Sequence, residues 1–414
     1  MAEDSRIPLV APFCGERYDA ISDISDLIAP PYDVIDPDQR TAFEKKNAHN
    51  IVSLILPKGN GDKYDNAANM LAEWRKNEVL KKDKGDMVYV VQQEFVTPAG
   101  NTFIRTGVIA AVAVEPYEGG RVRPHEKTHK GPKEDRLALM RSTKAMFEAL
   151  LMMSPDKTGS LIEEIGAVTQ MRQPEFEAVL DEVVISLWPV GGKAARAIAE
   201  AASHDDLYIA DGHHRYETGV AYSKENPNAN RTLGLIVPLK DPGLVVLPTH
   251  RMIGGSKVDT KMIEDLTSSH FDIEHTTHDD LAGALKPKRE EEVSAVVVLP
   301  DNQALRLSLK TDADLSKLAF ANDPTLLALD VAKVDSMVVT PLAEAAGGEK
   351  LSYTPDIAQA KALVDDGAVR AAVLVNPVSV QQVLDVADAG SFMPQKSTYF
   401  QPKAASGLVT LGWE

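Results

Sequence analysis

The pattern of hydrophobic and polar positions predicts a mixture of helices and strands. Apolar residues recur at helical spacing in three segments, residues 66–83, 136–153 and 193–203. β-Branched and aromatic residues dominate residues 87–96 and 102–115, and the Thr-Pro-Ala-Gly-Asn between them is typical of a hairpin. Helices mixed with hairpin strands predict the α+β fold class rather than a purely parallel sheet.

The pattern also predicts how the chain is divided. Acidic helical segments alternate with short strands over residues 257–375, and few functional polar groups cluster there. We therefore expect residues 1–256 to form the functional body and residues 257–375 a smaller α/β segment. Residues 376–414 are polar and aromatic, and we expect this tail to return to the site in the body.

Composition and charge narrow the function classes. A formal charge of −17 over 414 residues argues against nucleic-acid binding, because phosphate backbones bind positive surfaces. No apolar stretch approaches the roughly 20 residues that a membrane helix needs. Acidic residues occupy the start, where a signal peptide carries basic ones, and Cys14 is the sole cysteine. We expect a cytoplasmic protein with small-molecule partners, and any anion site in it must be local.

The most informative stretch is "LYIADGHHRYETGVAY", residues 207–222. A short apolar run leads into an Asp-Gly step, and apolar residues then recur at helical spacing. Five residues therefore lie where a strand passes into a helix: Asp211, Gly212, His213, His214 and Arg215. A helix amino end is already partly positive, so a cation there costs about 0.3–1 kcal/mol. A bound phosphate or carboxylate would relieve this conflict by accepting hydrogen bonds from the first turn, from Arg215 and from a protonated histidine.

Two other interpretations of this stretch remain open. In the first, Asp211 caps the helix and the histidines are solvated surface groups. In the second, Asp211 and one histidine bind a metal ion. Adjacent histidines point in different directions on a helix, so His213 and His214 would not readily bind the same ion.

Residues 121–144 hold eight Lys and Arg against three Asp and Glu, in a strongly acidic chain. Such a segment either meets polyanionic groups or is a solvated charged loop. Within it, Arg136 is a candidate anion-binding residue and Glu126 a candidate acid or base. Two further clusters of hydrogen-bond donors follow, His250 with Arg251 after a strand, and Lys396 with Ser397 and Thr398 in the tail. No P-loop, dinucleotide-binding or nucleophile-elbow motif occurs.

Five blocks together resemble domain-of-unknown-function family 1015 over essentially the full length. They are "APPYDVID", "RPHEKTHKGPKEDRLALMRST", "DGHHRYET", "LPTHRMI" and "MPQKSTYF". The "DGHHR" block is similar to the signature of the ParB/sulfiredoxin-like superfamily, which includes free-serine kinases. The resemblance thus implies a ParB/sulfiredoxin-like body and a phosphoryl-transfer site.

Phosphoryl transfer needs cations around the transferred group, usually including Mg²⁺, and a carboxylate that takes the hydroxyl proton. Under this hypothesis Asp211 binds Mg²⁺ or takes the proton, with Glu126 as the rival base, and His213 contacts the transferred phosphoryl. The remaining candidates bind phosphate or substrate: Gly212, His214, Arg215, Arg136, His250, Arg251, Lys396, Ser397 and Thr398.

Together with the predicted anion site, the resemblance implies a phosphotransferase that acts on a small hydroxylated metabolite such as free L-serine, with a nucleotide or pyrophosphate donor. Two alternatives stay open: a non-catalytic protein that binds a nucleotide or phospho-metabolite, and a metal-dependent hydrolase using Asp211 and His213. The sequence leaves the donor, the acceptor and the oligomeric state undecided.

Overall fold

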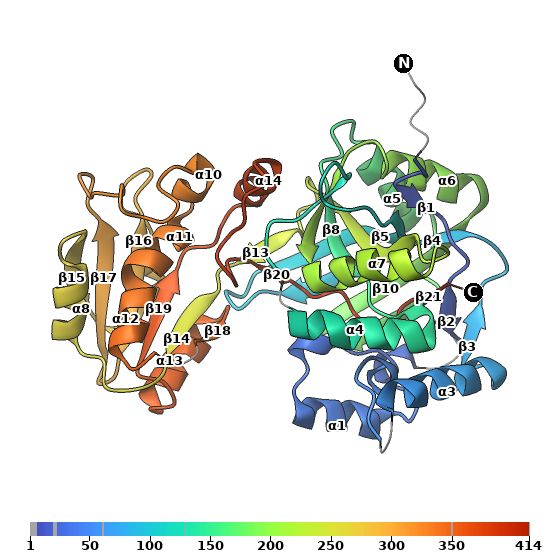
Figure 1. Cartoon of the computed structure of the whole chain (residues 1–414), viewed down its shortest axis with the longest axis horizontal. Coiled ribbons are helices and arrows are strands. Elements are labelled where there is room, and N and C mark those ends of the chain that lie inside the picture. The colour runs from blue at the N-terminus through green and yellow to red at the C-terminus, as the bar shows by residue number, and fades with distance from the viewer. Residues whose placement is uncertain (1–5, 20–22, 60–61, 129, 349–350, 414) are drawn as a thin grey trace. The chain divides into compact units, whose positions relative to one another are not determined.

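The structure is a computed structural model that describes residues 6–19, 23–59, 62–128, 130–348 and 351–413. The chain forms two compact units (Figure 1). The bounds of the first unit are Met1–Pro124, Thr128–Val245 and Pro402–Glu414, and those of the second are His125–Lys127 and Val246–Gln401.

Among the described residues, nine strands form one sheet in the first unit, in the order β6-β11-β8-β12-β5-β4-β10-β9 with β1 beside β5. Their bounds are β1 (Val10–Ala11), β4 (Met87–Val96), β5 (Thr102–Ala113), β6 (Val122–Arg123), β8 (Leu150–Ser154), β9 (Phe176–Leu180), β10 (Val183–Gly191), β11 (Leu207–Asp211) and β12 (Arg231–Pro238). Strand β11 runs parallel to β6, and β8 runs parallel to β12, whereas the other neighbours are antiparallel. The mixed sheet and its helices confirm the predicted α+β class.

The predicted hairpin is confirmed. Strands β4 and β5 pair antiparallel, with Val96 opposite Thr102 next to the turn. Residues 108–113 at the far end of β5 are all buried, as expected for a central strand.

Helices cover this sheet. Helices α5 and α6 pack against β4, α7 packs against β8 and β12, and the neighbouring pairs α7–α4 and α4–α3 are in contact (Figure 1). The helices of the first unit are η1 (Ile24–Asp26), η2 (Tyr32–Val34), α1 (Pro37–Lys46), α2 (Val52–Ile55), α3 (Lys63–Lys76), α4 (Lys130–Thr143), α5 (Ser160–Met171), α6 (Gly192–Ala201) and α7 (His213–Glu225).

Two predicted helices extend too far. Helix α4 ends at Thr143 because Lys144 adopts a positive φ of 50°. The apolar run that follows forms β7 (Ala145–Met146) and the fully buried β8. A continuous apolar run carries no periodicity that separates a buried strand from a buried helix, so the prediction for residues 136–153 was wrong beyond Thr143. Likewise α3 ends at Lys76, and residues 80–82 form β3 (Leu80–Lys82), which pairs with β2 (Glu16–Tyr18).

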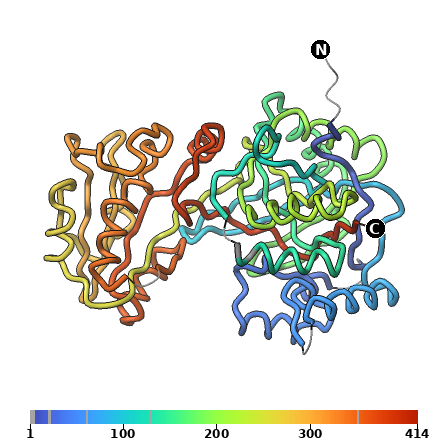
Figure 2. The backbone as a smooth tube through the Cα atoms, viewed as in Figure 1, coloured from blue at the N-terminus to red at the C-terminus, as the bar shows by residue number. Residues whose placement is uncertain are grey.

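The last residues of the chain belong to the first unit. Strand β21 (Leu411–Gly412) pairs with β7, and backbone bridges join Glu16 to Thr410 and Ala29 to Ser406. Figure 2 shows this red segment among elements from the blue and green parts of the chain. Residues from both ends of the sequence are thereby held beside the central sheet.

The second unit contains a six-stranded antiparallel sheet in the order β15-β17-β16-β19-β14-β18. Its core packs side chains of β16 and β19 against α9 and α13. The strands are β14 (His250–Ile253), β15 (Phe271–Thr276), β16 (Ser294–Leu299), β17 (Gln303–Leu309), β18 (Ser352–Thr354) and β19 (Ala371–Val375), with the short β13 (Val245–Leu247) and β20 (Tyr399–Gln401) outside this sheet. The helices are α8 (Thr260–Thr267), η3 (His278–Asp280), α9 (Leu281–Leu285), α10 (Pro324–Leu327), α11 (Asp330–Val334), the π-helix η4 (Asp335–Val339), α12 (Thr340–Ala345), α13 (Ile357–Asp365) and α14 (Val380–Asp388).

The predicted domain boundaries at residues 256 and 375 stay a prediction. Strand β14 precedes the first boundary and lies in the sheet of the second unit, and residues 376–401 also belong to that unit. Within the described part of the chain, no helix has the length and apolarity that crossing a membrane requires.

The close approach of β5 and β12 generates a stability prediction. A Cβ on Gly107 would lie 2.7 Å from the carbonyl oxygen of Ile236 and 2.9 Å from Cγ2 of Val237. We expect Gly107→Ala to lower the free energy of unfolding of the first unit by about 1–3 kcal/mol, because backbone atoms would have to shift. Urea unfolding followed by tryptophan fluorescence measures this, since all three tryptophans lie in the first unit.

The matched control is Gly85→Ala. A Cβ on Gly85 meets nothing within 4 Å, so the expected change is within about 0.5 kcal/mol. Equal unfolding midpoints for the two variants would contradict the packing described for β5 and β12.

Candidate functional site

The predicted passage from strand to helix at Asp211 and Gly212 is confirmed. Strand β11 ends at Asp211, Gly212 adopts a φ of 100°, and α7 begins at His213. A Cβ on Gly212 would lie 2.7 Å from Cδ2 of Leu150, so both the backbone angle and the space require glycine. The interpretation of Asp211 as the helix cap is wrong, because Gly212 is the N-cap residue and no side chain caps this helix.

The Asp211 carboxylate instead binds two cations. Its Oδ2 accepts a hydrogen bond from Nη2 of Arg215 at 2.9 Å, and its Oδ1 accepts one from Nζ of Lys403 at 2.6 Å. Burial alone would raise the pKa of Asp211, but the charges of Lys403, Arg215 and His213 outweigh it and hold the pKa well below its usual range. Asp211 is therefore ionised at neutral pH, and it is a weak proton acceptor.

The pairing of Arg215 with Asp211 reduces the electrostatic conflict that the sequence predicts at the amino end of α7. Arg215 is 2% exposed, and its Nη1 also donates to the carbonyl oxygen of Ala149 at 2.8 Å. Burial opposes the charge of Arg215, but Glu148 and Asp211 raise its pKa above the ordinary value. The chain itself thus supplies the first negative partner of Arg215.

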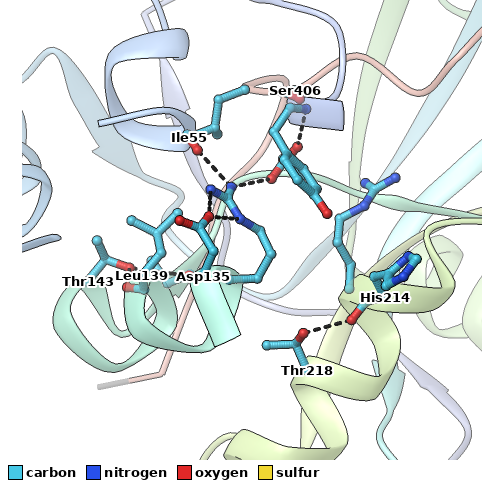
Figure 3. Close-up of polar contacts among 12 residues, drawn as sticks. Ile55, Asp135, Leu139, Thr143, His214, Thr218 and Ser406 are labelled. Carbon is cyan, nitrogen blue, oxygen red and sulfur yellow. Dashed lines mark hydrogen bonds and ion pairs between the residues drawn. The ribbon is translucent and has the colours of Figure 1, made fainter. Parts of the chain in front are cut away.

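A second buried guanidinium belongs to Arg136 on α4, which is 3% exposed. Its Nη1 donates to the carbonyl oxygen of Ile55 at 2.7 Å, and its Nη2 donates to Asp135 at 2.6 Å (Figure 3). The guanidinium carbon also lies 4.2 Å from the centre of the Tyr32 ring. Lys63 donates to Asp135 at 2.8 Å, so this carboxylate is shared between two cations.

Glu148 lies next to Arg136, and its charge also acts on Arg215. Its Oε1 accepts the backbone N–H of Tyr32 at 2.9 Å, and its Oε2 lies 3.5 Å from Nη1 of Arg136. Arg136, Glu148 and Arg215 line one small cavity of about 20 Å³ together with apolar residues, including Leu139 and Phe147. The structure therefore brings Arg136 and Arg215 of the predicted site together.

We call Arg136, Glu148, Asp211, Arg215 and Lys403 the cationic cluster. It contains three cations and two carboxylates. Asp135 pairs with both Arg136 and Lys63, and the charge of Asp33 also acts on Arg215. Four of these side chains are at most 15% exposed, and that of Asp211 is 18% exposed. Three largely buried cations thus lie beside the partly positive amino end of α7, and both features favour an anion.

The two histidines lie in the first turn of α7. His213 is 5% exposed, and its charge contributes to the low pKa of Asp211. His214 is partly buried, and its carbonyl oxygen accepts a hydrogen bond from Oγ1 of Thr218 at 2.7 Å (Figure 3). The predicted contacts of both imidazoles with phosphate stay predictions.

The remaining predicted site residues lie in the second unit. Arg251 is 1% exposed and forms a two-point ion pair with Asp335, with N–O distances of 2.7 and 2.8 Å. His250 is fully buried, and its Nδ1 accepts the backbone N–H of Val375 at 3.2 Å. Burial and then the charge of Arg251 lower the pKa of His250 to about 4, so this imidazole is neutral at pH 7. Both residues begin β14 rather than a loop, and their proposed anion binding stays a prediction.

A short segment around Glu126 lies beside the tail residues of the second unit. The backbone N–H of Met393 donates to the carbonyl oxygen of His125, and Oγ1 of Thr398 lies 3.4 Å from Nε2 of the same histidine. Ser397 donates to the carbonyl oxygen of Pro394, and Lys396 is exposed with a positive φ of 56°. The roles predicted for Glu126, Lys396, Ser397 and Thr398 stay predictions.

The residues were also considered as ligands for Mg²⁺. Within the described ranges, no group of three or more His, Cys, Asp and Glu side chains is arranged to hold a metal ion. Both oxygens of Asp211 accept hydrogen bonds from cations. Asp211 in this arrangement therefore does not fit the role of a metal ligand, and Mg²⁺ remains a proposal.

Sequence reasoning left Lys403 and Glu148 out of the site. Lys403 lies 192 residues from its partner Asp211, a distance at which no local pattern operates. Glu148 stands alone in the apolar run "AMFEALLMM", which was interpreted as part of a helix. The charge of Glu148 within an apolar run was the available signal, because a buried charge requires a partner.

A family model described as "Protein of unknown function (DUF1015)" matches residues 10–332. The chain belongs to this family. The search of curated proteins found no significant match to this chain.

Several solved structures are similar to this DUF1015 chain. A conserved hypothetical protein from Pyrococcus furiosus has 14% identity and a TM-score of 0.34, covering 69% of this chain and 91% of its own. A free serine kinase in complex with AMP has 11% identity and a TM-score of 0.34, with coverages of 67% and 83%. SbnI with a C-terminal truncation, from Staphylococcus aureus, has 11% identity and a TM-score of 0.37, with coverages of 72% and 84%.

The low pKa of Asp211 generates a pH prediction. A carboxyl group whose pKa is lower when folded stabilises the protein above its unfolded value of about 3.9, and this contribution disappears as the pH falls toward the folded pKa. We expect Asp211→Asn to cost about 3–5 kcal/mol at pH 7, because two largely buried cations lose their partner. The variant should also lose less stability than the wild type between pH 5 and pH 3, measured by urea unfolding at each pH.

Glu164→Gln, at an exposed position on α5, is the control with the same change of charge. Its unfolding free energy should follow the wild-type pH profile. Parallel profiles for Asp211→Asn and the wild type would show that the ion pairs of Asp211 are absent in solution.

Proposed function

We propose that this protein is a phosphotransferase that moves a phosphoryl group from a nucleotide or pyrophosphate to the hydroxyl of a small metabolite. The observation that supports this most is the grouping of three largely buried cations in the cationic cluster beside the amino end of α7. The similarity of the Asp-Gly-His-His-Arg motif to that of free-serine kinases makes free L-serine the first acceptor to test.

The chemistry of phosphoryl transfer fits such a cluster. Charge on the transferred group is spread over its oxygens, and catalysis consists mainly of positioning it among fixed cations. Arg136 and Arg215 donate hydrogen bonds to backbone carbonyl groups, so folding already orients them before a ligand binds. A guanidinium can also donate two parallel hydrogen bonds to phosphate oxygens, which an ammonium cannot do.

The low pKa of Asp211 changes the role proposed for this residue. We propose that Asp211 orients Arg215 and Lys403, and that another carboxylate takes the hydroxyl proton. Mg²⁺ would then arrive bound to the donor phosphates, as part of the substrate. His213, in the first turn of α7, would contact the transferred phosphoryl.

Phosphorus NMR tests the proposal. The purified full-length chain is incubated with L-serine, Mg²⁺ and ATP, ADP or pyrophosphate in turn. The expected product is O-phosphoserine, formed with one of these donors and absent without serine. Donor hydrolysis that does not need serine would establish a hydrolase instead, and donor binding without any turnover would establish a non-catalytic binding protein.

Arg215→Lys tests the residue assignment. This change keeps the positive charge but removes the planar pair of donors, and we expect kcat/KM to fall about 100-fold, as when one donor to a transition-state anion is lost. The same change at Arg141, an exposed arginine on α4 paired with Glu225, is the control and should leave kcat/KM unchanged. Tryptophan fluorescence confirms that both variants are folded, and equal activities would remove Arg215 from the site.

A further inference from the structure

Gln93 and Arg105 form a buried polar pair in the centre of the first unit's sheet. They are directly opposite each other on β4 and β5, and they are 2% and 1% exposed. Oε1 of Gln93 accepts a hydrogen bond from Nη2 of Arg105 at 2.6 Å. Polar groups this deeply buried are costly unless they are paired, so the pair needs an explanation beyond packing.

The other end of the Gln93 amide leads to the cationic cluster. Its Nε2 donates to the backbone carbonyl oxygen of Lys403 at 3.1 Å, and Nζ of Lys403 donates to Asp211 at 2.6 Å. Lys403 is thus held at its backbone by Gln93 and at its ammonium by Asp211. The Gln93 amide contacts Arg105 and the Lys403 carbonyl, so Lys403 is its link to the cluster.

Arg105 determines which way the Gln93 amide points. A guanidinium only donates, so the amide oxygen must face Arg105, and the amide NH₂ must then face the carbonyl group of Lys403. Burial lowers the pKa of Arg105 to about 9, opposed by the charges of Asp241 and Asp211, so Arg105 still carries its charge at pH 7.

The surroundings of Arg105 hold it firmly in place. Asp241 accepts the backbone N–H groups of Thr106 and Gly243 at 3.1 and 2.9 Å. A Cβ on Gly243 would lie 2.4 Å from both the backbone nitrogen and Cα of Arg105, so this turn packs directly on β5. The backbone of Arg105 is therefore closely packed where its side chain meets the Gln93 amide.

We propose that Gln93 is a positioning residue that places the Lys403 ammonium in the cationic cluster, and that Arg105 fixes the orientation of the Gln93 amide. The inference rests on the proposed function in one respect, which is that the cluster binds a phosphate ligand. The placement of Lys403 itself can be measured without any ligand.

Binding of pyrophosphate by calorimetry is the first test. Gln93→Leu keeps a similar volume and removes the hydrogen bonds with both Arg105 and Lys403, and we expect the Kd to rise about 10-fold. In a Lys403→Ala background the same change should have no further effect on the Kd, because Gln93 acts through the ammonium that is already gone. An equal loss in both backgrounds would overturn the inference.

Gln92→Leu is the matched control for the binding test. Gln92 neighbours Gln93 on β4, but its Nε2 donates to Oγ1 of Thr106 at 3.2 Å rather than to Lys403. Its Kd for pyrophosphate should equal that of the wild type. If the wild type binds neither pyrophosphate nor ATP nor ADP, the proposed function fails, and the labelling test below decides the inference alone.

Reductive methylation followed by mass spectrometry measures the exposure of the Lys403 amine without a ligand. In the wild type, Lys403 is 15% exposed and should react slowly. We expect at least a 5-fold faster reaction in Gln93→Leu, with no change at Lys133, which is bound to Glu217 in the same unit. An unchanged rate at Lys403, or a parallel rise at Lys133, would contradict a specific positioning role.

Discussion

The first unit depends on one carboxylate held between two cations from distant parts of the chain. Asp211 ends β11, Arg215 lies one turn into α7, and Lys403 comes from the returning C-terminal segment. Removing charges from water is expensive, and the attraction between them offsets that cost only where the geometry is good. The ion pairs therefore constrain the strand, the helix and the C-terminal segment to a single arrangement.

The same constraint explains why the cluster suits an anion although the chain already contains a negative partner. Asp211 forms ion pairs with Arg215 and Lys403, and Glu148 lies 3.5 Å from Nη1 of Arg136. Three cations are grouped there, and the partly positive amino end of α7 adds to their effect. The proposed phosphate ligand would bind among cations that backbone carbonyl groups and carboxylates already orient.

Local patterns predicted the parts of this arrangement that depend on neighbouring residues. The passage from β11 to α7 could be predicted because Gly212 marks the turn and the apolar spacing changes there. The partners of Asp211 and Arg136 could not be predicted in full, because Lys403 and Ile55 reach them across 192 and 81 residues. The apolar run 145–153 was assigned to a helix because burial on both sides of a strand erases the alternation that identifies it.

A buried amide in a central strand illustrates how such a distant contact is made precise. Main-chain pairing of β4 with β5 places Gln93 opposite Arg105. Because a guanidinium donates hydrogen bonds and accepts none, the amide oxygen of Gln93 must face Arg105. The NH₂ group of Gln93 then donates to the Lys403 carbonyl. The register of the β4–β5 hairpin thereby helps to determine where the Lys403 ammonium lies. A hydrophobic residue at position 93 would fill the space in the sheet, but it would remove the hydrogen bonds with both Arg105 and the Lys403 carbonyl. The polar pair is consistent with a requirement for a fixed charge rather than for stability.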